Sequence, residues 1–113
     1  MTARFRTAKA AQIAMMNAAL KHFGELTVQV TTHQQERKYG GGFSSRLTLP
    51  GSDISLTAYH EGRWRASYSP VTGRDMHGFE CTGESAEDAL RQLSERMLRV
   101  AQEYHREAAH ISL

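Results

Sequence analysis

The stretch FSSRLTLPGSDISLTAYHEGRWRASYS, residues 43–69, decides the fold. Three runs within it, 43–49, 54–59 and 64–68, alternate apolar and polar residues. This alternation is typical of strands that have one buried and one solvated face. Turn-forming residues separate the runs, so we expect an antiparallel meander at the centre of the chain.

The length of the second turn fixes how the last two runs pair. A two-residue turn would place apolar residues opposite polar ones, although cross-strand neighbours share a face of the sheet. A three-residue turn at 60–62 instead pairs Ala58 with Trp64 and gives one continuous apolar face. Gly62 then takes the left-handed position of a bulged turn.

The same register predicts what the other face of the meander carries. A four-residue turn at 50–53 pairs Leu49 with Ile54, and the outward residues of the three strands then fall into three rows. The first row holds Arg46, Thr57 and Arg65, the second Ser44, Tyr59 and Arg63, and the third Thr48, Ser55 and Ser67. We therefore expect a hydroxyl-rich face that carries three arginines and a tyrosine.

A helix is predicted before the meander. Apolar residues recur at helical spacing in the alanine-rich segment 7–23, and Gly24 follows as a C-terminal cap. The expected buried stripe of this helix is Ala10, Ile13, Met16, Leu20 and Phe23.

A second helix is predicted after the meander. Ser85 is its expected N-cap, and Asp88 takes the acidic position of a capping box three residues later. The expected buried stripe of this helix is Leu90, Leu93, Met97, Val100 and Tyr104.

Two shorter segments complete the sheet. Leu26, Val28 and Val30 alternate with polar residues and predict a first strand, which a loop over 34–42 joins to the meander. The run 79–82 is a candidate for one further short strand, so the predicted number of strands is four or five. The order of elements predicts an α+β fold, a two-layer sandwich in which both helices cover the apolar face of an antiparallel sheet.

The composition bounds the class of protein. At 113 residues, with 40% hydrophobic and 23% charged residues, the chain has room for a single domain, 1–113, with a basic arm at 1–6 and a frayed tail at 108–113. The single cysteine, Cys81, excludes an intrachain disulfide and a cysteine-based zinc cluster. Neither a membrane span nor a signal peptide is evident, so we expect a cytoplasmic protein without a membrane partner.

The charge is nearly balanced, with 14 Lys and Arg against 12 Asp and Glu, a formal net charge of +2. That total does not by itself indicate a nucleic-acid binder. Eleven of the 14 cations are arginines, which form bidentate and stacked contacts and therefore fit a contact surface. A coding bias toward arginine is the alternative explanation.

Catalytic patterns are weak in this sequence. The histidines lack the spacing of a zinc hydrolase, and a metal site would have to gather His33, His60 and His77 across loops. Cys81 with His77 as its base is a poor nucleophilic pair, and a buried structural thiol is the favoured interpretation. We therefore expect no enzyme, no metal and no cofactor.

A strand, strand, loop and helix pattern runs over residues 61–93. It is carried by Glu61, Gly62, Trp64, Ala66, Tyr68, Pro70, Gly73, Gly83, Glu84, Ser85, Glu87, Ala89, Leu90 and Leu93. This pattern resembles HicB-type antitoxin domains over roughly a third of the chain, although residues 69–73 replace their Asp-Leu-Pro-Gly turn and 74–81 are inserted. The resemblance implies a non-catalytic protein that blocks a partner through its surface.

The order of elements also resembles that of double-stranded-RNA-binding domains. In that family, lysines at the start of the second helix contact the RNA phosphates. The corresponding segment here, 84–88, carries three acidic residues that would repel phosphates, so we discount binding of double-stranded RNA.

The functional hypothesis is a small non-enzymatic binding or inhibitor protein that docks on a protein or nucleoprotein partner, of the kind that phages and mobile elements encode. The alternative is direct nucleic-acid binding by the arginine and tyrosine side chains of the sheet. A homodimer is also left open. The candidate partner-binding residues are Arg46, Thr57, Tyr59, Arg63 and Arg65 on the sheet, Arg37, Lys38 and Tyr39 in the loop, and Arg4 and Arg6 in the N-terminal arm.

Overall fold

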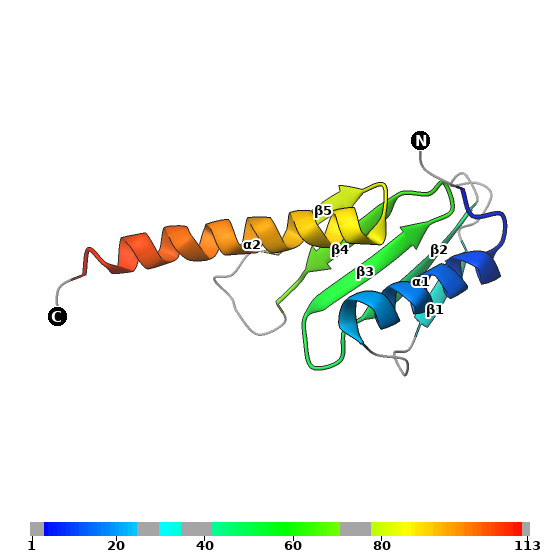
Figure 1. Ribbon diagram of the computed structural model, residues 1–113, viewed down its shortest axis with the longest axis horizontal. Coiled ribbons are helices and arrows are strands. Elements are labelled where there is room, and N and C mark those ends of the chain that lie inside the picture. The colour runs from blue at the N-terminus through cyan, green and yellow to red at the C-terminus, as the bar shows by residue number, and fades with distance from the viewer. Residues whose placement is uncertain (1–3, 25–29, 35–41, 71–77, 112–113) are drawn as a thin grey trace.

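Five strands form one antiparallel sheet in the order of the chain, with a helix before and a helix after them (Figure 1). The computed structural model describes residues 4–24, 30–34, 42–70 and 78–111. Within these ranges the elements are α1 (Ala8–Phe23), β1 (Val30–Gln34), β2 (Phe43–Thr48), β3 (Ile54–Tyr59), β4 (Trp64–Tyr68), β5 (Phe79–Gly83) and α2 (Ala86–Ala108). The predicted α+β fold is confirmed, with the fifth strand present.

Both predicted turns and the register between them are confirmed. The amide of Leu49 donates to the carbonyl of Ile54 at 2.9 Å across the first turn. Ala58 pairs with Trp64 across the second turn. Gly62 has φ +98°, a backbone conformation that side-chain-bearing residues rarely adopt, so the bulged turn depends on glycine.

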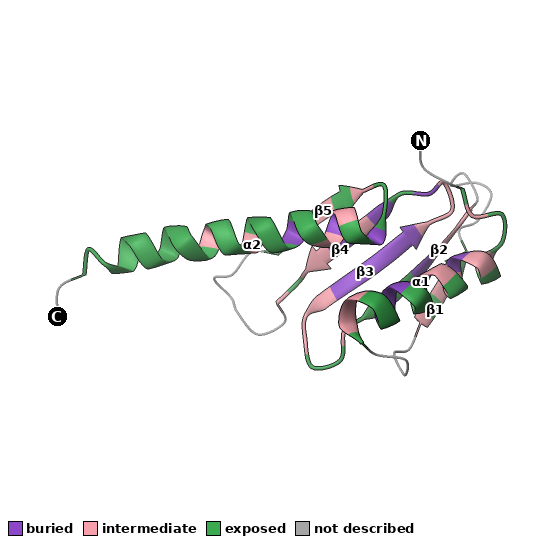
Figure 2. Cartoon of the chain, viewed as in Figure 1, coloured by how far each residue is buried: buried purple, intermediate pink, exposed green. Residues whose placement is uncertain are grey.

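The core lies on one face of the sheet, between the strands and both helices. Leu56 and Ala58 at the centre of β3 are fully buried there (Figure 2). Met15 of α1 and Leu93 of α2 pack into the same cluster from the two helices. Both helices therefore cover one face, and the opposite face of the sheet is left without a helix.

The predicted buried stripe of α1 is wrong. Ile13, Met16 and Leu20 are 51%, 46% and 48% exposed. The helix instead buries the face formed by Ala11, Met15, Ala18 and Ala19, while Ala10 and Phe23 are half-buried. Small alanine side chains let the helix backbone lie close to the sheet, and this close approach decides which face is buried.

The predicted stripe of α2 is correct only in its first half. Leu93 is buried, and Leu90, Met97 and Val100 are half-buried. Tyr104, in contrast, is 65% exposed, and every residue from 101 to 111 is exposed. The helix runs past the end of the sheet, so its second half has no strand to cover (Figures 1 and 2).

The first strand continues past the end that the sequence predicts. Within the described residues it begins at Val30 and continues to Gln34, which pairs with Phe43 of β2, so Gln34 belongs to the strand and not to the loop. Leu26 and Val28 lie outside the described residues. None of the described helices is both long enough and apolar enough to cross a membrane.

Candidate functional site

Five of the predicted partner-binding residues lie together on the sheet face that the helices leave free. We call this cluster the arginine face; it comprises Arg46, Thr57, Tyr59, Arg63 and Arg65. Cross-strand pairing places Arg46 beside Thr57 and Thr57 beside Arg65. The turn between β3 and β4 brings Arg63 next to Tyr59, whose amide donates to the Arg63 carbonyl at 2.9 Å. The structure therefore assembles these residues as the register predicts.

Tyr59 lies beneath two guanidinium groups. The central guanidinium carbon of Arg63 is 4.2 Å from the ring centroid, and that of Arg65 is 5.5 Å away. Cation–π contacts of this kind hold arginine side chains in place over a ring. The tyrosine consequently serves as a support for the arginines, and a nucleic-acid base would have to displace them in order to stack on it.

Two acidic side chains that the sequence did not indicate neutralise part of the positive charge. Glu61 Oε1 lies 3.3 Å from Arg63 Nε, and Glu80 Oε2 lies 3.7 Å from Arg65 Nη1. The register of β5 against β4 brings Glu80 to this face, opposite Ser67. A register extended to the fifth strand could have found Glu80, whereas the Glu61 contact depends on side-chain rotamers.

The central hydroxyls of this face are buried although no helix covers them. Ser55 and Thr57 are each only 4% exposed. Arg46 Nη2 donates to Ser55 Oγ at 3.3 Å, and Ser55 Oγ lies 2.6 Å from Ser67 Oγ. The expectation of a fully solvated face is therefore wrong at its centre, because the long arginine side chains lie over the short hydroxyl side chains.

Among the described residues, Arg46 has fewer internal partners than the other two arginines of this face. It is exposed, and within the described part of the chain it forms no ion pair. Arg65, in contrast, is largely covered, and its buried Nε has no hydrogen-bond partner among the described residues. Arg46 is consequently the guanidinium that an anionic partner can reach at the smallest desolvation cost.

The predicted N-terminal arm is attached to the sheet at Phe5. The amide of Phe5 donates to the carbonyl of His60 at 3.0 Å, and its ring meets the Trp64 ring edge-on, with the centroids 6.0 Å apart. Arg4 and Arg6, on either side of Phe5, are both exposed. These two arginines therefore lie at the end of the sheet where the turn leading to Arg63 is located.

Three predicted binding residues in the loop, Arg37, Lys38 and Tyr39, lie outside the described residues, as does His77. Within the described ranges no three His, Cys, Asp or Glu side chains are close enough together to hold a metal ion. Cys81 is half-buried opposite Ala66 and packs against the core.

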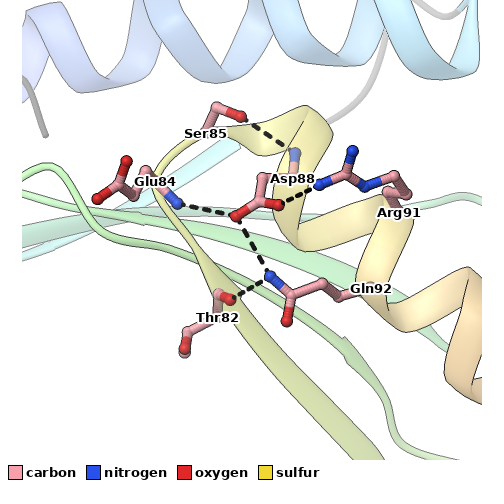
Figure 3. Close-up of polar contacts among 6 residues, drawn as sticks. All are labelled: Thr82, Glu84, Ser85, Asp88, Arg91 and Gln92. Carbon is pink, nitrogen blue, oxygen red and sulfur yellow. Dashed lines mark hydrogen bonds and ion pairs between the residues drawn. The ribbon is translucent and has the colours of Figure 1, made fainter. Parts of the chain in front are cut away.

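The start of α2 carries a dense network of polar contacts (Figure 3). Ser85 Oγ accepts from the Asp88 amide at 3.0 Å, as the capping box predicts. The Asp88 carboxylate accepts from the Glu84 amide at 3.4 Å, from Gln92 Nε2 at 3.2 Å and from Arg91 Nη2 at 2.7 Å. Gln92 Nε2 also donates to the Thr82 carbonyl at 3.0 Å, so the network ties the helix to β5.

This network should make the protein less stable as the pH becomes acidic. The hydrogen bond from Gln92 is the largest of the effects that hold the pKa of Asp88 below its ordinary value of 3.8. A carboxyl whose pKa is lower in the folded state stabilises the fold above its unfolded pKa, and this stabilisation disappears as the pH falls through the folded pKa. We expect Asp88→Asn to be less stable than the wild type at pH 7 and the difference to shrink below about pH 4.

Urea denaturation of both proteins between pH 7 and pH 2 measures this effect. Ser85→Ala is the matched comparison, because it removes a cap that does not titrate and should cost about 1 kcal/mol. A difference between wild type and Asp88→Asn that stays constant over the whole pH range would contradict the assigned role of Asp88.

Comparison with known proteins yields no relative of this chain. No family model, no curated protein and no solved structure matches it. The resemblance of residues 61–93 to HicB-type antitoxin domains therefore remains a prediction from the sequence.

Proposed function

We propose that this protein is a small, non-enzymatic binding protein that docks through the arginine face on an anionic surface of a protein or nucleoprotein. One observation carries the proposal: three arginines lie in adjacent rows of a sheet face that both described helices leave free. Guanidinium groups on a flat face suit carboxylates or phosphates, because each can form two parallel hydrogen bonds with such a group. Docking of this kind inhibits a partner because it covers the surface through which that partner contacts other molecules.

The details of the face favour a protein surface over free nucleic acid. The cations at Arg63 and Arg65 alternate with the anions at Glu61 and Glu80. Such a mixed pattern complements a surface that also carries both signs of charge, whereas a nucleic-acid backbone presents negative charge alone. The Tyr59 ring, already covered by arginines, offers little to an unstacked base.

The alternative, direct binding of nucleic acid, rests on the exposure of Arg46 and Arg63 beside a tyrosine. These two groups could contact phosphates without disturbing the buried part of the face. Binding that depends on phosphates weakens steeply as the salt concentration rises. A mobility-shift assay with single- and double-stranded oligonucleotides at low salt separates the two functions.

The test of the proposed function reverses one charge. Arg46→Glu should reduce partner binding by at least about tenfold, because it places a carboxylate where an anionic surface would dock. Its effect on stability should stay within about 1 kcal/mol, since the exposed side chain loses one hydrogen bond to Ser55, which keeps Ser67 as a partner. The immobilised protein is used to capture partners from a lysate, and the amount retained by the wild type and by Arg46→Glu is compared.

Arg106→Glu on α2 is the matched control. It makes the same change of charge at an exposed position on the part of the helix that runs past the end of the sheet, and it should leave capture unchanged. Equal loss from both variants would mean that net charge and not this face controls binding. Retention by Arg46→Glu at the wild-type level would refute the assignment of the face, and an Arg46-dependent oligonucleotide shift would instead support the nucleic-acid alternative.

A further inference from the structure

The second half of α2 packs against no other element among the described residues. From residue 101 onward every described side chain is exposed, and the helix extends beyond the sheet (Figures 1 and 2). A helical segment of about 10 residues is only marginally stable on its own in water. The exposed side chains of this half include the large apolar residues Leu98 and Tyr104, and the exposed Ile111 follows the end of the helix. These features indicate a surface that another helix covers.

A regular apolar pattern runs along this half. Large residues recur every seven positions at Leu90, Met97, Tyr104 and Ile111, and small ones recur at Ser94, Ala101 and Ala108. Six of these residues lie on α2, which ends at Ala108, and we call this line of six the α2 seam; Ile111 follows after the helix has ended. Spacings that alternate between three and four residues keep the line on one side of the helix, as in a coiled coil.

Charged residues avoid this line. Between residues 95 and 108 the helix carries six of them, and all lie at positions outside the seam: Glu95, Arg96, Arg99, Glu103, Arg106 and Glu107. The seam is flanked instead by the apolar residues Leu98 and Val100. A solvated helix face would not separate charge from apolar residues in this way.

The first half of the seam opens into an apolar groove. This groove has a volume of about 580 Å³ and lies between α2 and the end of α1. Seam residues Leu90, Ser94 and Met97 line one side of it, and Phe23 and Ile54 also contribute. The free second half of the helix and the groove beside its first half therefore form one continuous apolar surface.

We propose that a second copy of this chain covers this surface, with the two α2 helices packed antiparallel. In that arrangement Ala101 of each copy faces Tyr104 of the other, and Met97 faces Ala108. Every layer then pairs one large with one small side chain, which fills the space evenly. Met97, which lines the groove, therefore lies against Ala108, the last residue of the partner's helix.

A parallel pair fits the same surface poorly. Identical residues would then meet, so layers with two tyrosines would alternate with layers of two alanines. The two sheets, which both lie at the start of α2, would also be forced to the same end of the pair. The antiparallel arrangement places the sheets at opposite ends, and it joins two arginine faces in one bivalent particle.

The first test measures the molar mass of the full chain by sedimentation equilibrium. The wild type should be a dimer, and Ala101→Glu should raise the dimer dissociation constant by at least about 100-fold, because it buries a charge at the centre of the seam. Ala101 is exposed, so the fold of each copy should persist. Glu103→Ala, two residues away and outside the seam, should leave the dimer intact.

The second test distinguishes the two orientations by disulfide formation in a Cys81→Ser background. Met97→Cys with Ala108→Cys should give a covalent dimer, whereas each single variant should not, because antiparallel packing places equal positions about 16 Å apart along the axis. Cross-linking by the single variants would replace the proposed orientation with a parallel one. A monomer at every concentration, or a dimer indifferent to Ala101→Glu, would overturn the proposal.

Discussion

Replacing Trp64 with alanine is expected to lower the free energy of unfolding by about 3–5 kcal/mol, a large part of the total stability of a small domain. Trp64 is the largest side chain of the core and is 8% exposed. With Ala14, Ala18 and Ala86 it lines the space between the two helices. Its ring also supports Phe5 through an edge-on contact, with the two planes at 76°. The three alanines that line this space are too short to fill the cavity that the substitution would leave.

Urea denaturation monitored by circular dichroism measures this loss. Trp64→Phe is the matched control, because it keeps an aromatic ring against Phe5 and should retain more of the stability. Trp64→Ala should also release the segment that carries Arg4 and Arg6, which limited proteolysis would detect as faster cleavage near the N-terminus. A loss smaller than about 1 kcal/mol would show that the core does not depend on this side chain.

The sheet could be predicted from the sequence because two independent constraints agree on it. Alternation defines which residues share a face, and the turn lengths define which residues lie opposite each other. Only the three-residue turn at 60–62 satisfies both. The rows of the arginine face follow from the same register, so the positions of Arg46 and Arg65 were predictable.

The buried face of α1 could not be predicted in this way. Apolar residues occur on every side of this helix, so both Met15 and Met16 are candidates for the core. Burial of Met15 follows from the alanines beside it, which allow closer packing against the sheet than Ile13 and Leu20 would. Periodicity alone does not show whether a helix buries its largest side chains or the small side chains that let it lie close to the sheet.

The extent of α2 and the state of the arginine face depend on tertiary structure. The apolar pattern of the helix continues past Met97, and nothing in the sequence indicates where the sheet beneath it ends. Likewise, the contact of Glu61 with Arg63 and the position of Tyr59 under two guanidiniums depend on rotamers, which alternation does not encode. The structure therefore changes the candidate site from a freely solvated surface to a partly neutralised one, in which Arg46 is exposed and forms no ion pair among the described residues.

The second large effect is expected at Gly83, the last residue of β5. A Cβ atom at this position would lie 2.8 Å from the backbone nitrogen of Ala89 and 3.0 Å from Asp88 Cβ. Both atoms belong to the first turn of α2, which cannot yield without moving the whole helix. Gly83 is therefore required by the close approach of helix and strand, since its φ lies outside the left-handed region that glycine alone favours.

Gly83→Val should lower the free energy of unfolding by more than about 3 kcal/mol, beyond the usual cost of overpacking, because the added atoms meet backbone that is fixed by the Ser85 cap. Thr82→Val, on the exposed side of the same strand, should change stability by less than about 0.5 kcal/mol. Thermal and urea denaturation of the two variants measure the difference.

The same substitution also links the fold to the proposed dimer. In any Gly83→Val protein that remains folded, α2 must lie farther from β5. This displacement moves the α2 seam relative to the end of α1, which forms the other side of the groove. The dimer of this variant should then dissociate at higher protein concentrations than that of Thr82→Val, although no seam residue has changed. A destabilised but equally tight dimer would show that self-association depends on the free half of α2 alone, without the groove at its base.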